Sequence, residues 1–313
     1  MNKQVEQVTT SSQPGLVISY FGNSVAVEAA DGQVFQCHLR RNQELPLVGD
    51  RVVWQLEKDN TGIVLAIEPR RSLLARGNDR ADGQGKMKAL AANVDAMIVV
   101  MAPPPSFSEH LIDRYLIAAE ILDLQPIIVL NKIDLLDGAL RKAAEDRLIP
   151  YREVGYQALL VSALTEEGLA DLAALLKDKT SVLVGPSGVG KSSIIIDFVK
   201  QDIRTQDVSA RGAGKHTTTA TRLYHLPAGG HLIDSPGVRD FSLWTVSAEE
   251  VLKGFKEFQP FMTGCKFRNC SHTVEPGCVV QKALADGKLS AARHASYQEF
   301  IKEARKGANK KYE

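Results

Sequence analysis

VLNKID (Val129–Asp134) runs from an apolar stretch, which reads as a buried strand, into three polar side chains. Asn131 and Asp134 carry groups that suit guanine, because a carboxylate can accept hydrogen bonds from the ring N–H and from the exocyclic amine, which adenine does not present together. Lys132 would cover the face of the ring. The stretch therefore predicts a base-binding loop at the end of a strand.

A second loop, GPSGVGKSS, follows the apolar run SVLVG and opens a predicted helix, which is the context that a phosphate-binding P-loop requires. Its glycines allow backbone N–H groups to close around phosphates, and the helix N-terminus adds the positive end of its dipole. Lys191 would reach the β and γ phosphates, and the Ser192 hydroxyl would ligate Mg²⁺. The predicted nucleotide contacts are Gly185, Pro186, Ser187, Gly188, Val189, Gly190, Lys191, Ser192 and Ser193.

Two further segments after the P-loop suit phosphate chemistry. DSPG ends the apolar run HLI, where Asp234 can hold Mg²⁺ through water and the Gly237 N–H can sense the γ-phosphate, although DSPG alone is also an ordinary turn. Residues 208–222, rich in Gly, hydroxyls and positive charge, read as a loop that closes over the γ-phosphate. Thr218 is our choice for an added Mg²⁺ ligand, although a Thr run before a strand is common without that role.

The order of these motifs predicts a rearranged domain. Ser162-Ala163-Leu164 stands after the strand that follows NKID, where a second base-contacting loop is expected. Both base motifs therefore precede the three phosphate motifs, whereas an ordinary GTPase has the phosphate loop first. Strands that alternate with helices indicate a parallel, doubly wound sheet. We expect a circularly permuted α/β P-loop GTPase domain over residues 94–243 that binds GTP and GDP.

The residue after the DSPG glycine is Val238, where Ras-like GTPases carry the Gln that orients the attacking water. Val238 cannot do this, so we expect slow intrinsic hydrolysis unless another group or a partner completes the site. His216 is the nearest candidate by motif, and its alternative is a solvated loop histidine. We assign catalytic roles to His216 and Thr218. The chain after Val238 leads directly into the C-terminal region. The permutation would therefore couple the DSPG segment, which is the second switch of a GTPase, to that region.

The regions that flank this domain differ from it in texture. Residues 14–68 hold five short β-like runs separated by turn formers, which favours an oligonucleotide-binding (OB) type barrel, although an SH3-like barrel would look similar. Residues 1–13 read as a flexible tail and residues 69–93, rich in Gly and charge, as a basic linker. Tyr20, Phe21 and Trp54 could stack bases, but packing in the core suits them equally well.

Three of the four cysteines cluster near a histidine in residues 244–313, where we expect a mainly helical domain with a basic C-terminal helix. Three thiolates and one imidazole form a closed tetrahedral set for one structural Zn²⁺, with free thiols as the alternative. Cys37 stands alone on an alternating stretch and reads as a buried apolar residue. The predicted zinc ligands are Cys265, Cys270, His272 and Cys278.

Bulk composition limits the range of partners. The chain has 313 residues, and 38 Lys plus Arg against 37 Asp plus Glu make no global case for nucleic acid, so such binding must rest on local patches. A charge run is usually only a solvated helix face. No apolar run approaches the ~20 residues of a membrane-spanning helix, and the polar N-terminus lacks the apolar core of a signal peptide, so we expect a cytoplasmic protein without a membrane partner. The candidate RNA contacts are Arg70, Arg71, Lys302, Arg305 and Lys306.

The permuted order, together with GKHTTT, DSPGV and the Cys-Cys-His-Cys set, resembles the ribosome small-subunit-dependent GTPase family (RsgA/YjeQ) over essentially the whole chain. The resemblance implies an OB barrel, a permuted G domain and a C-terminal zinc domain. It implies a monomeric late-stage assembly factor of the 30S subunit that binds 16S rRNA and whose GTPase activity the subunit stimulates. The family motifs map onto Asn131, Lys132, Asp134, Gly185–Ser193, Thr218, Asp234, Gly237 and the four zinc ligands.

Two rival interpretations stay open on the residues alone. A permuted GTPase acting on the large subunit would share the central motifs, but the zinc cluster and the OB-like front argue against it. The second interpretation is an RNA-binding scaffold in which GTP is only a conformational ligand. Val238 is compatible with it, because this residue cannot orient the attacking water.

Overall fold

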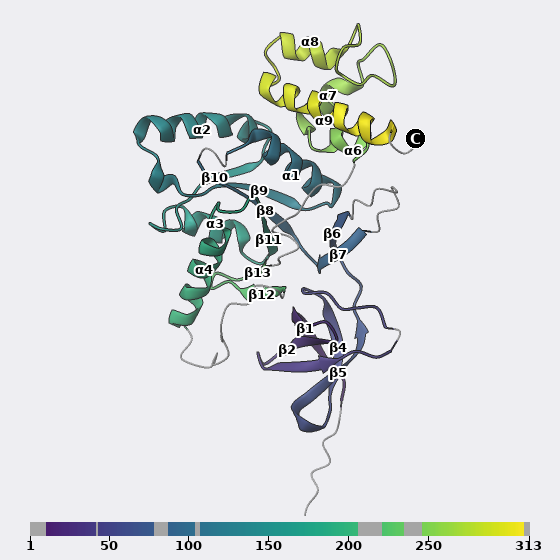
Figure 1. The fold of residues 1–313 in the computed structure, drawn as a ribbon, viewed down its shortest axis with the longest axis vertical. Helices are drawn as coiled ribbons and strands as arrows, with labels where there is room; N and C mark the ends of the chain where they lie inside the picture. The colour runs from purple at the N-terminus through teal and green to yellow at the C-terminus, as the bar shows by residue number, and fades with distance from the viewer. Residues whose placement is uncertain are drawn as a thin grey trace, which may run out of the picture.

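The computed structural model describes residues 11–41, 43–77, 87–103, 107–205, 221–234 and 246–309. The chain forms three modules stacked along its long axis, with the barrel at the bottom of Figure 1, the α/β domain in the middle and the helical module at the top. This arrangement confirms the predicted multidomain architecture.

The N-terminal module is a five-stranded barrel in the order β1-β2-β3-β5-β4, closed by pairing of β1 with β4. Its β3 and β5 are parallel, and its other strand pairs are antiparallel. Trp54 and Cys37 are fully buried at its centre, so Trp54 is a core residue and cannot stack on a base. Burial raises the pKa of the Cys37 thiol to about 12, as expected for an inert apolar position. The strands are β1 Gln13–Tyr20, β2 Ser24–Ala29, β3 Val34–His38, β4 Arg51–Leu56 and β5 Thr61–Ile67.

The range 69–93 is not a simple linker. Its described parts form a two-stranded antiparallel sheet of β6 (Leu73–Gly77) and β7 (Met87–Ala92). Leu74 and Ala91 are fully buried in the same core cluster as the central domain. The prediction of a linker was wrong because it relied on the high Gly and charge content of the range. The few apolar residues of the range are buried by the central domain, which lies far away in sequence.

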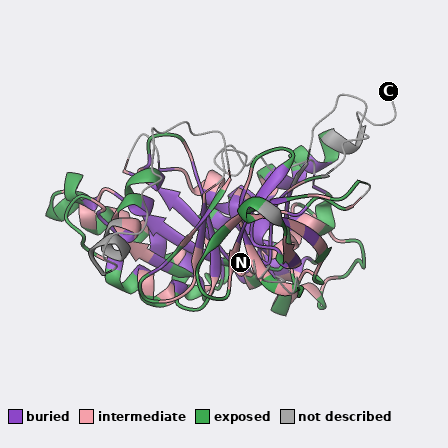
Figure 2. Ribbon diagram, turned by 90° about the horizontal axis from the view of Figure 1, so that it is seen from below, coloured by how far each residue is buried: buried purple, intermediate pink, exposed green. Residues whose placement is uncertain are grey.

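The central module carries the sheet order β10-β9-β8-β11-β13-β12, with the first five strands parallel and β12 antiparallel to β13. Alternate side chains of β8 and β9 enter two different core clusters, so helices cover both faces. Figure 2 shows these strands as the buried centre of the domain. The strands are β8 Ala96–Met101, β9 Gln125–Leu130, β10 Gln157–Leu160, β11 Thr180–Val184, β12 Arg222–His225 and β13 His231–Asp234.

The helices of this domain begin where the sequence supplies caps. The Ser108 side chain accepts a hydrogen bond from the Leu111 N–H and so caps α1. The Asp137 side chain caps α2 in the same way. Leu148 and Tyr151 of α2 are buried in the core cluster that also holds side chains of β8 and β9. The helices are α1 Glu109–Ile121, α2 Gly138–Glu153, α3 Leu169–Leu176 and α4 Lys191–Thr205.

Strand β12 also joins the barrel to the central sheet. Ser19 of β1 pairs with Arg222 of β12, and the Ser19 hydroxyl donates to the Thr221 carbonyl at 3.1 Å. Glu28 of β2 contacts His225 of β12 at 2.8 Å. One continuous sheet of 11 strands therefore runs through both modules.

The C-terminal module packs its helices on α1. Its Gly254 lies so close to Ile117 of α1 that an added Cβ would sit 2.5 Å from the Ile117 side chain. The fully buried Arg293 contacts Asp113 of α1 and Glu257, its Nε lying 2.8 Å from Glu257. None of the helices in the described ranges is long and apolar enough to cross a membrane. The elements are α6 Ala248–Lys253, η3 Lys256–Phe258, α7 Gln259–Met262, α8 Val279–Ala285 and α9 Ala291–Asn309.

Candidate functional site

A pocket of about 450 Å³ lies at the carboxyl end of the parallel strands, where ligands of open α/β sheets bind. It brings together the loop after β9, the loop after β10 and the start of α4. Both predicted base motifs and the end of the predicted P-loop therefore meet at one cavity. Its lining residues are Asn131, Lys132, Asp134, Leu135, Ala163, Leu164, Ser193, Ile196 and Asp197.

Asn131 ties the three segments together. Its side chain is almost completely buried, its Nδ2 donates to the Val189 carbonyl at 2.9 Å, and its Oδ1 accepts from the Ala163 N–H at 3.1 Å. The two bonds join the loop after β9 to the P-loop and to the loop after β10. Asn131 thus positions the walls of the pocket.

Asp134 projects from the same loop and is exposed toward the pocket. The buried Ser162 hydroxyl donates to Asp134 Oδ1 at 2.5 Å and accepts from the Thr165 N–H at 3.1 Å. Ser162 therefore orients the carboxylate that the sequence predicts to read guanine. Lys132 adopts a left-handed conformation with a φ of 64°, and its Nζ donates to the Gly188 carbonyl at 2.6 Å.

The P-loop requires glycine at two described positions. Gly185 has a φ of 136°, and a Cβ there would meet the Val100 carbonyl oxygen at 2.1 Å. Gly190 has a φ of 96°, and a Cβ there would meet Asn131 Nδ2 at 2.2 Å. Lys191 is buried within the loop, where its Nζ donates to the carbonyls of Gly185 and Pro186, both at 2.7 Å. The loop is therefore already closed around the Lys191 ammonium.

The other predicted phosphate residues divide into two groups. Asp234 ends β13, which lies parallel to β11, the strand that leads into the P-loop. Ser192 and Ser193 are exposed in the first turn of α4. Thr218, His216, Gly237 and Val238 lie outside the described residues.

Sequence reasoning missed three lining residues of the pocket, which are Leu135, Ile196 and Asp197. Leu135 directly follows the NKID motif and, like Leu164 of the second base motif, is among the most exposed large apolar side chains of the described residues. Ile196 and Asp197 lie one turn after Ser192 and Ser193 on α4, so helical spacing from the P-loop could have found them. Exposed apolar side chains in this pocket suit the faces of a purine ring.

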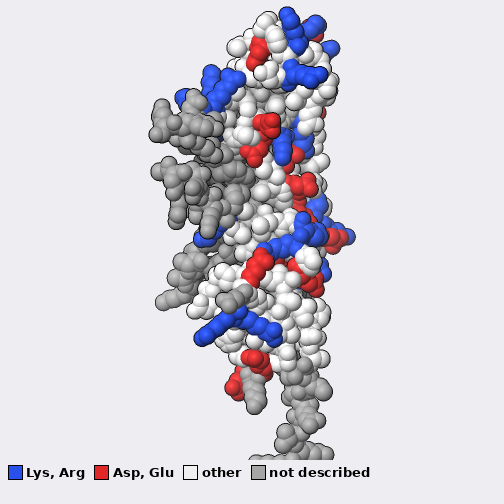
Figure 3. Space-filling view, turned by 90° about the vertical axis from the view of Figure 1, so that its right-hand side faces the viewer, with Lys and Arg blue, Asp and Glu red and all other residues white. Residues whose placement is uncertain are grey.

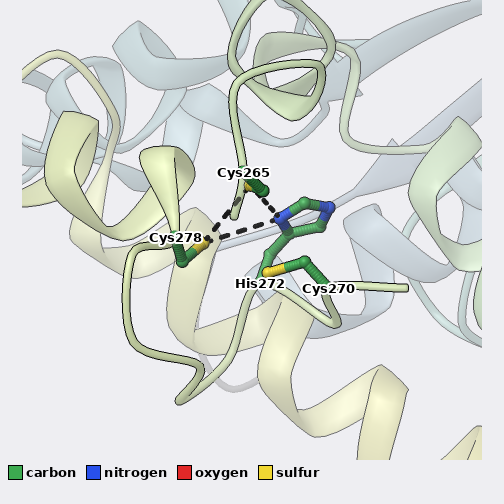
Figure 4. A group of neighbouring side chains, drawn as sticks. All are labelled: Cys265, Cys270, His272 and Cys278. Atoms are coloured by element: carbon green, nitrogen blue, oxygen red, sulfur yellow. Dashed lines mark hydrogen bonds between the residues drawn. The ribbon is translucent and has the colours of Figure 1, made fainter. Parts of the chain in front are cut away.

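The Cys265, Cys270, His272 and Cys278 side chains converge in the C-terminal module (Figure 4). Their donor atoms lie within 4.8 Å of one another. His272 Nδ1 is 3.5 Å from Cys265 Sγ and 3.6 Å from Cys278 Sγ, and those two sulfurs are 4.0 Å apart. A tetrahedral Zn²⁺ site needs edges of about 3.6 Å for N to S and about 3.8 Å for S to S. The donor set and its spacing fit Zn²⁺.

A shell of contacts holds the histidine ligand. The His272 backbone is left-handed with a φ of 59°, and its carbonyl lies 3.0 Å from His294 Nε2 of α9. The Tyr297 hydroxyl donates to the neighbouring Ser271 carbonyl at 2.9 Å. Burial lowers the pKa of His272, which favours the neutral imidazole that a metal requires. The cluster is therefore positioned by the last helix of the chain.

The predicted RNA contacts lie in different surroundings. Arg70 donates from Nε and Nη2 to the Asp50 carboxylate, each at 2.8 Å, and also pairs with Glu44, so the protein itself neutralises it. Arg71 pairs with Asp95 at 2.8 Å but stays largely exposed. Figure 3 shows basic side chains on the C-terminal module at the top of the view. Lys302, Arg305 and Lys306 are exposed on α9.

Known proteins resemble this chain along all three modules. A family model described as RsgA GTPase matches residues 67–244. A Vibrio cholerae protein named small ribosomal subunit biogenesis GTPase RsgA is 44% identical, with 98% of this chain and 81% of that protein covered. A protein of the same name from Klebsiella pneumoniae is 46% identical, with 92% and 83% covered.

Solved structures lead to the same architecture. YjeQ from Thermotoga maritima superimposes with a TM-score of 0.76 at 30% identity, covering 94% of this chain and 99% of that one. YloQ, described as a circularly permuted GTPase, gives a TM-score of 0.74 at 30% identity, covering 97% and 98%. The predicted permuted order of modules and motifs is confirmed by these similarities.

Proposed function

Because this chain belongs to the RsgA GTPase family and is a GTP hydrolase, we propose that it acts in the biogenesis of the small ribosomal subunit, as the names of its relatives state for those proteins. The barrel and the cysteine–histidine cluster favour the small-subunit role over that of a permuted GTPase of the large subunit. The observation that carries nucleotide binding is the Asn131–Val189 hydrogen bond of 2.9 Å. It joins a base-reading loop to a P-loop that comes later in the chain. A permuted GTPase needs this junction to bind the base and the phosphates of one nucleotide.

The residues of the pocket divide the work of binding GTP. Asp134, held by Ser162, accepts from the guanine N–H groups, and Lys132 covers one face of the ring. Lys191 exchanges its two carbonyl partners for phosphate oxygens, because an ammonium binds anionic oxygens more strongly than neutral ones. Nucleotide entry therefore replaces bonds within the P-loop and leaves the Asn131 junction intact.

Mg²⁺ fits this site, since the hydroxyl at the start of α4 and the carboxylate at the end of β13 are the oxygen ligands that it prefers. Ser192 would ligate the ion, Asp234 would hold it through water, and Thr218 would add a ligand from the segment of residues 208–222. The ion supplies neutralisation of the charge that develops on the phosphates. His216 orients the attacking water in place of the glutamine that Val238 replaces.

The outer modules provide the contacts with the ribosome. The barrel and the exposed basic side chains of α9 bind 16S rRNA, and one Zn²⁺ on the cysteine–histidine cluster stabilises the C-terminal module. The protein acts as a cytoplasmic monomer on a late assembly intermediate of the 30S subunit. Contact with that subunit completes the hydrolytic site and stimulates turnover.

Phosphate release from GTP tests the proposal, measured for the protein alone and with 30S, 50S or 70S particles at matched concentration. We expect strong stimulation by 30S particles alone. Stimulation by 50S particles instead would assign the protein to the large subunit. Equal, weak turnover in every mixture would overturn the small-subunit role and favour a scaffold for which GTP is only a conformational ligand.

A further inference from the structure

An exposed aromatic ring stands between two ligands of the cysteine–histidine cluster. Cys265 and Cys270 enclose the four residues Lys266-Phe267-Arg268-Asn269, here called the zinc loop, and all four are exposed. The Phe267 side chain is 41% exposed. The ring therefore offers part of its apolar surface to a ligand, and contact with that ligand would remove this surface from water.

The zinc loop is held in place at both ends. The Lys266 N–H donates to the Gly277 carbonyl at 3.2 Å, next to the ligand Cys278, and the Cys270 N–H donates back to the Phe267 carbonyl at 3.3 Å. The first bond ties the loop to the opposite side of the cluster, and the second closes a turn at Phe267. A ring presented by such a loop loses little conformational entropy when it binds.

The surroundings of Phe267 are cationic. Lys266 Nζ lies 5.6 Å from the centre of the Phe267 ring, and Arg268 follows in sequence. No Asp or Glu occurs from residue 259 to residue 274. The nearest acid in the following sequence, Glu275, turns its carboxylate onto the backbone N–H of Ser271 at 2.9 Å. Along the chain, the exposed ring is therefore flanked by cations and not by carboxylates.

We propose that the zinc loop binds single-stranded RNA, with one unpaired base stacked on Phe267 and the flanking phosphates paired with Lys266 and Arg268. An aromatic face between cations recognises a splayed-out base, because every base has a π-face and each nucleotide carries a phosphate. Duplex RNA keeps its bases stacked and cannot use the ring. The proposal rests on the proposed function, since it assigns part of the rRNA contact to the zinc loop.

The test uses the full zinc-loaded chain and a fluorescein-labelled mixed-sequence RNA, single-stranded or annealed to its complement. Phe267→Ala should weaken single-strand binding about tenfold or more and leave duplex binding unchanged. Phe267→Trp should restore the affinity. Val274→Ala is the matched control, because Val274 is an 82% exposed apolar residue of the same module outside the zinc loop. Lys266→Gln should lower the salt slope of log K by about 0.7.

Equal single-strand affinity of the Phe267→Ala and Val274→Ala variants, at equal zinc content, would overturn the proposal. Weaker binding of Phe267→Ala to 30S particles with unchanged binding to free single strands would also overturn it, because the ring would then contact a surface that only the particle presents. Stimulation of the parent protein by 30S particles is measured separately. Its absence removes the small-subunit role, whereas the RNA titration still decides the role of the zinc loop.

Discussion

Asn131 Nδ2 donates to the carbonyl of Val189 at 2.9 Å, although the two residues belong to motifs that the permutation has placed in reversed order. The packing around this bond is tight, because a Cβ on Gly190 would sit 2.2 Å from the same nitrogen. In space, the base loop and the phosphate loop form one unit. Cutting and rejoining the chain elsewhere leaves this contact unchanged, so the nucleotide site tolerates the permutation.

The junction predicts that Gly190→Ala disables the site. The added methyl group displaces Asn131 or forces a strained φ, and either change separates the two loops. We expect GTP affinity to fall by about a hundredfold in a fluorescent-nucleotide titration. Gly188→Ala is the matched control, since Gly188 also has a positive φ but has open space around its Cβ position. Similar losses in both variants would attribute the effect to backbone strain alone.

Asp134 should determine the choice of base. In Asp134→Asn, the amide N–H₂ can donate to the extra carbonyl of xanthine but can no longer accept twice from guanine. We expect GTP affinity to fall at least about tenfold and XTP affinity to rise, measured by competition against a labelled nucleotide. Ser162 donates to Asp134 Oδ1, so Ser162→Ala should weaken GTP without a gain for XTP. An unchanged GTP to XTP preference in Asp134→Asn would place the base elsewhere.

Residue type alone identified the segments that meet at the pocket and at the cysteine–histidine cluster, whereas it did not predict contacts between distant segments. The residues of the NKID loop, of the P-loop and of the zinc-ligand set each lie within a short stretch of sequence. Their patterns can therefore be identified without knowledge of the fold. The pairing of Ser19 with Arg222 depends on the register between two modules, which no local pattern encodes. The buried contact of Arg293 with Asp113 is a similar case, because an Arg in a basic helix reads as solvated.

His216 should be needed for the chemical step. His216→Ala is expected to lower 30S-stimulated phosphate release by about a hundredfold, since positioned acid–base groups contribute at least that much, while GTP affinity stays unchanged. Single-turnover kinetics separate the chemical step from product release. His110→Ala is a control at a histidine of α1 that contacts Glu299 of α9, away from the pocket. Intact stimulated turnover in His216→Ala would remove the catalytic assignment.

Zinc removal should unfold the C-terminal module before the others. The metal holds three thiolates and one neutral imidazole together. Without the metal, no hydrophobic contact takes over the stabilisation that these four bonds supply. Cys278→Ser should lower zinc affinity by at least about a hundredfold, measured by a chromophoric chelator. Cys37→Ala removes the cysteine outside the cluster and should retain one zinc per chain. Equal zinc content in both variants would contradict the assignment.

The buried ion contact between α1 and α9 should dominate the stability of the module interface. Arg293→Met leaves Asp113 without its cation, and the free energy of unfolding should fall by about 3–5 kcal/mol at pH 7.5. Burial raises the pKa of Asp113, so protonation in the folded state relieves the loss as pH falls. The deficit relative to the parent protein should shrink at pH 4 in urea denaturation. Equal deficits at both pH values would show that packing, not charge, causes the loss.

The interface between α1 and the C-terminal module should limit which elements move when the nucleotide changes. The permutation makes residues 238–245 the exit from the nucleotide site, while α6 is already fixed on α1 through the close contact of Gly254 with Ile117. A nucleotide-dependent movement should therefore change hydrogen exchange in residues 238–247 and in β12, which shares a pair with β1 of the barrel. It should leave α9 unchanged, because Arg293 holds that helix to Asp113. Exchange is compared between a GTP analogue and GDP. Identical hydrogen exchange after Val238 in the two nucleotide states would contradict the coupling hypothesis. A change in exchange confined to α9 would also contradict it, because the movement would then bypass the segment after Val238.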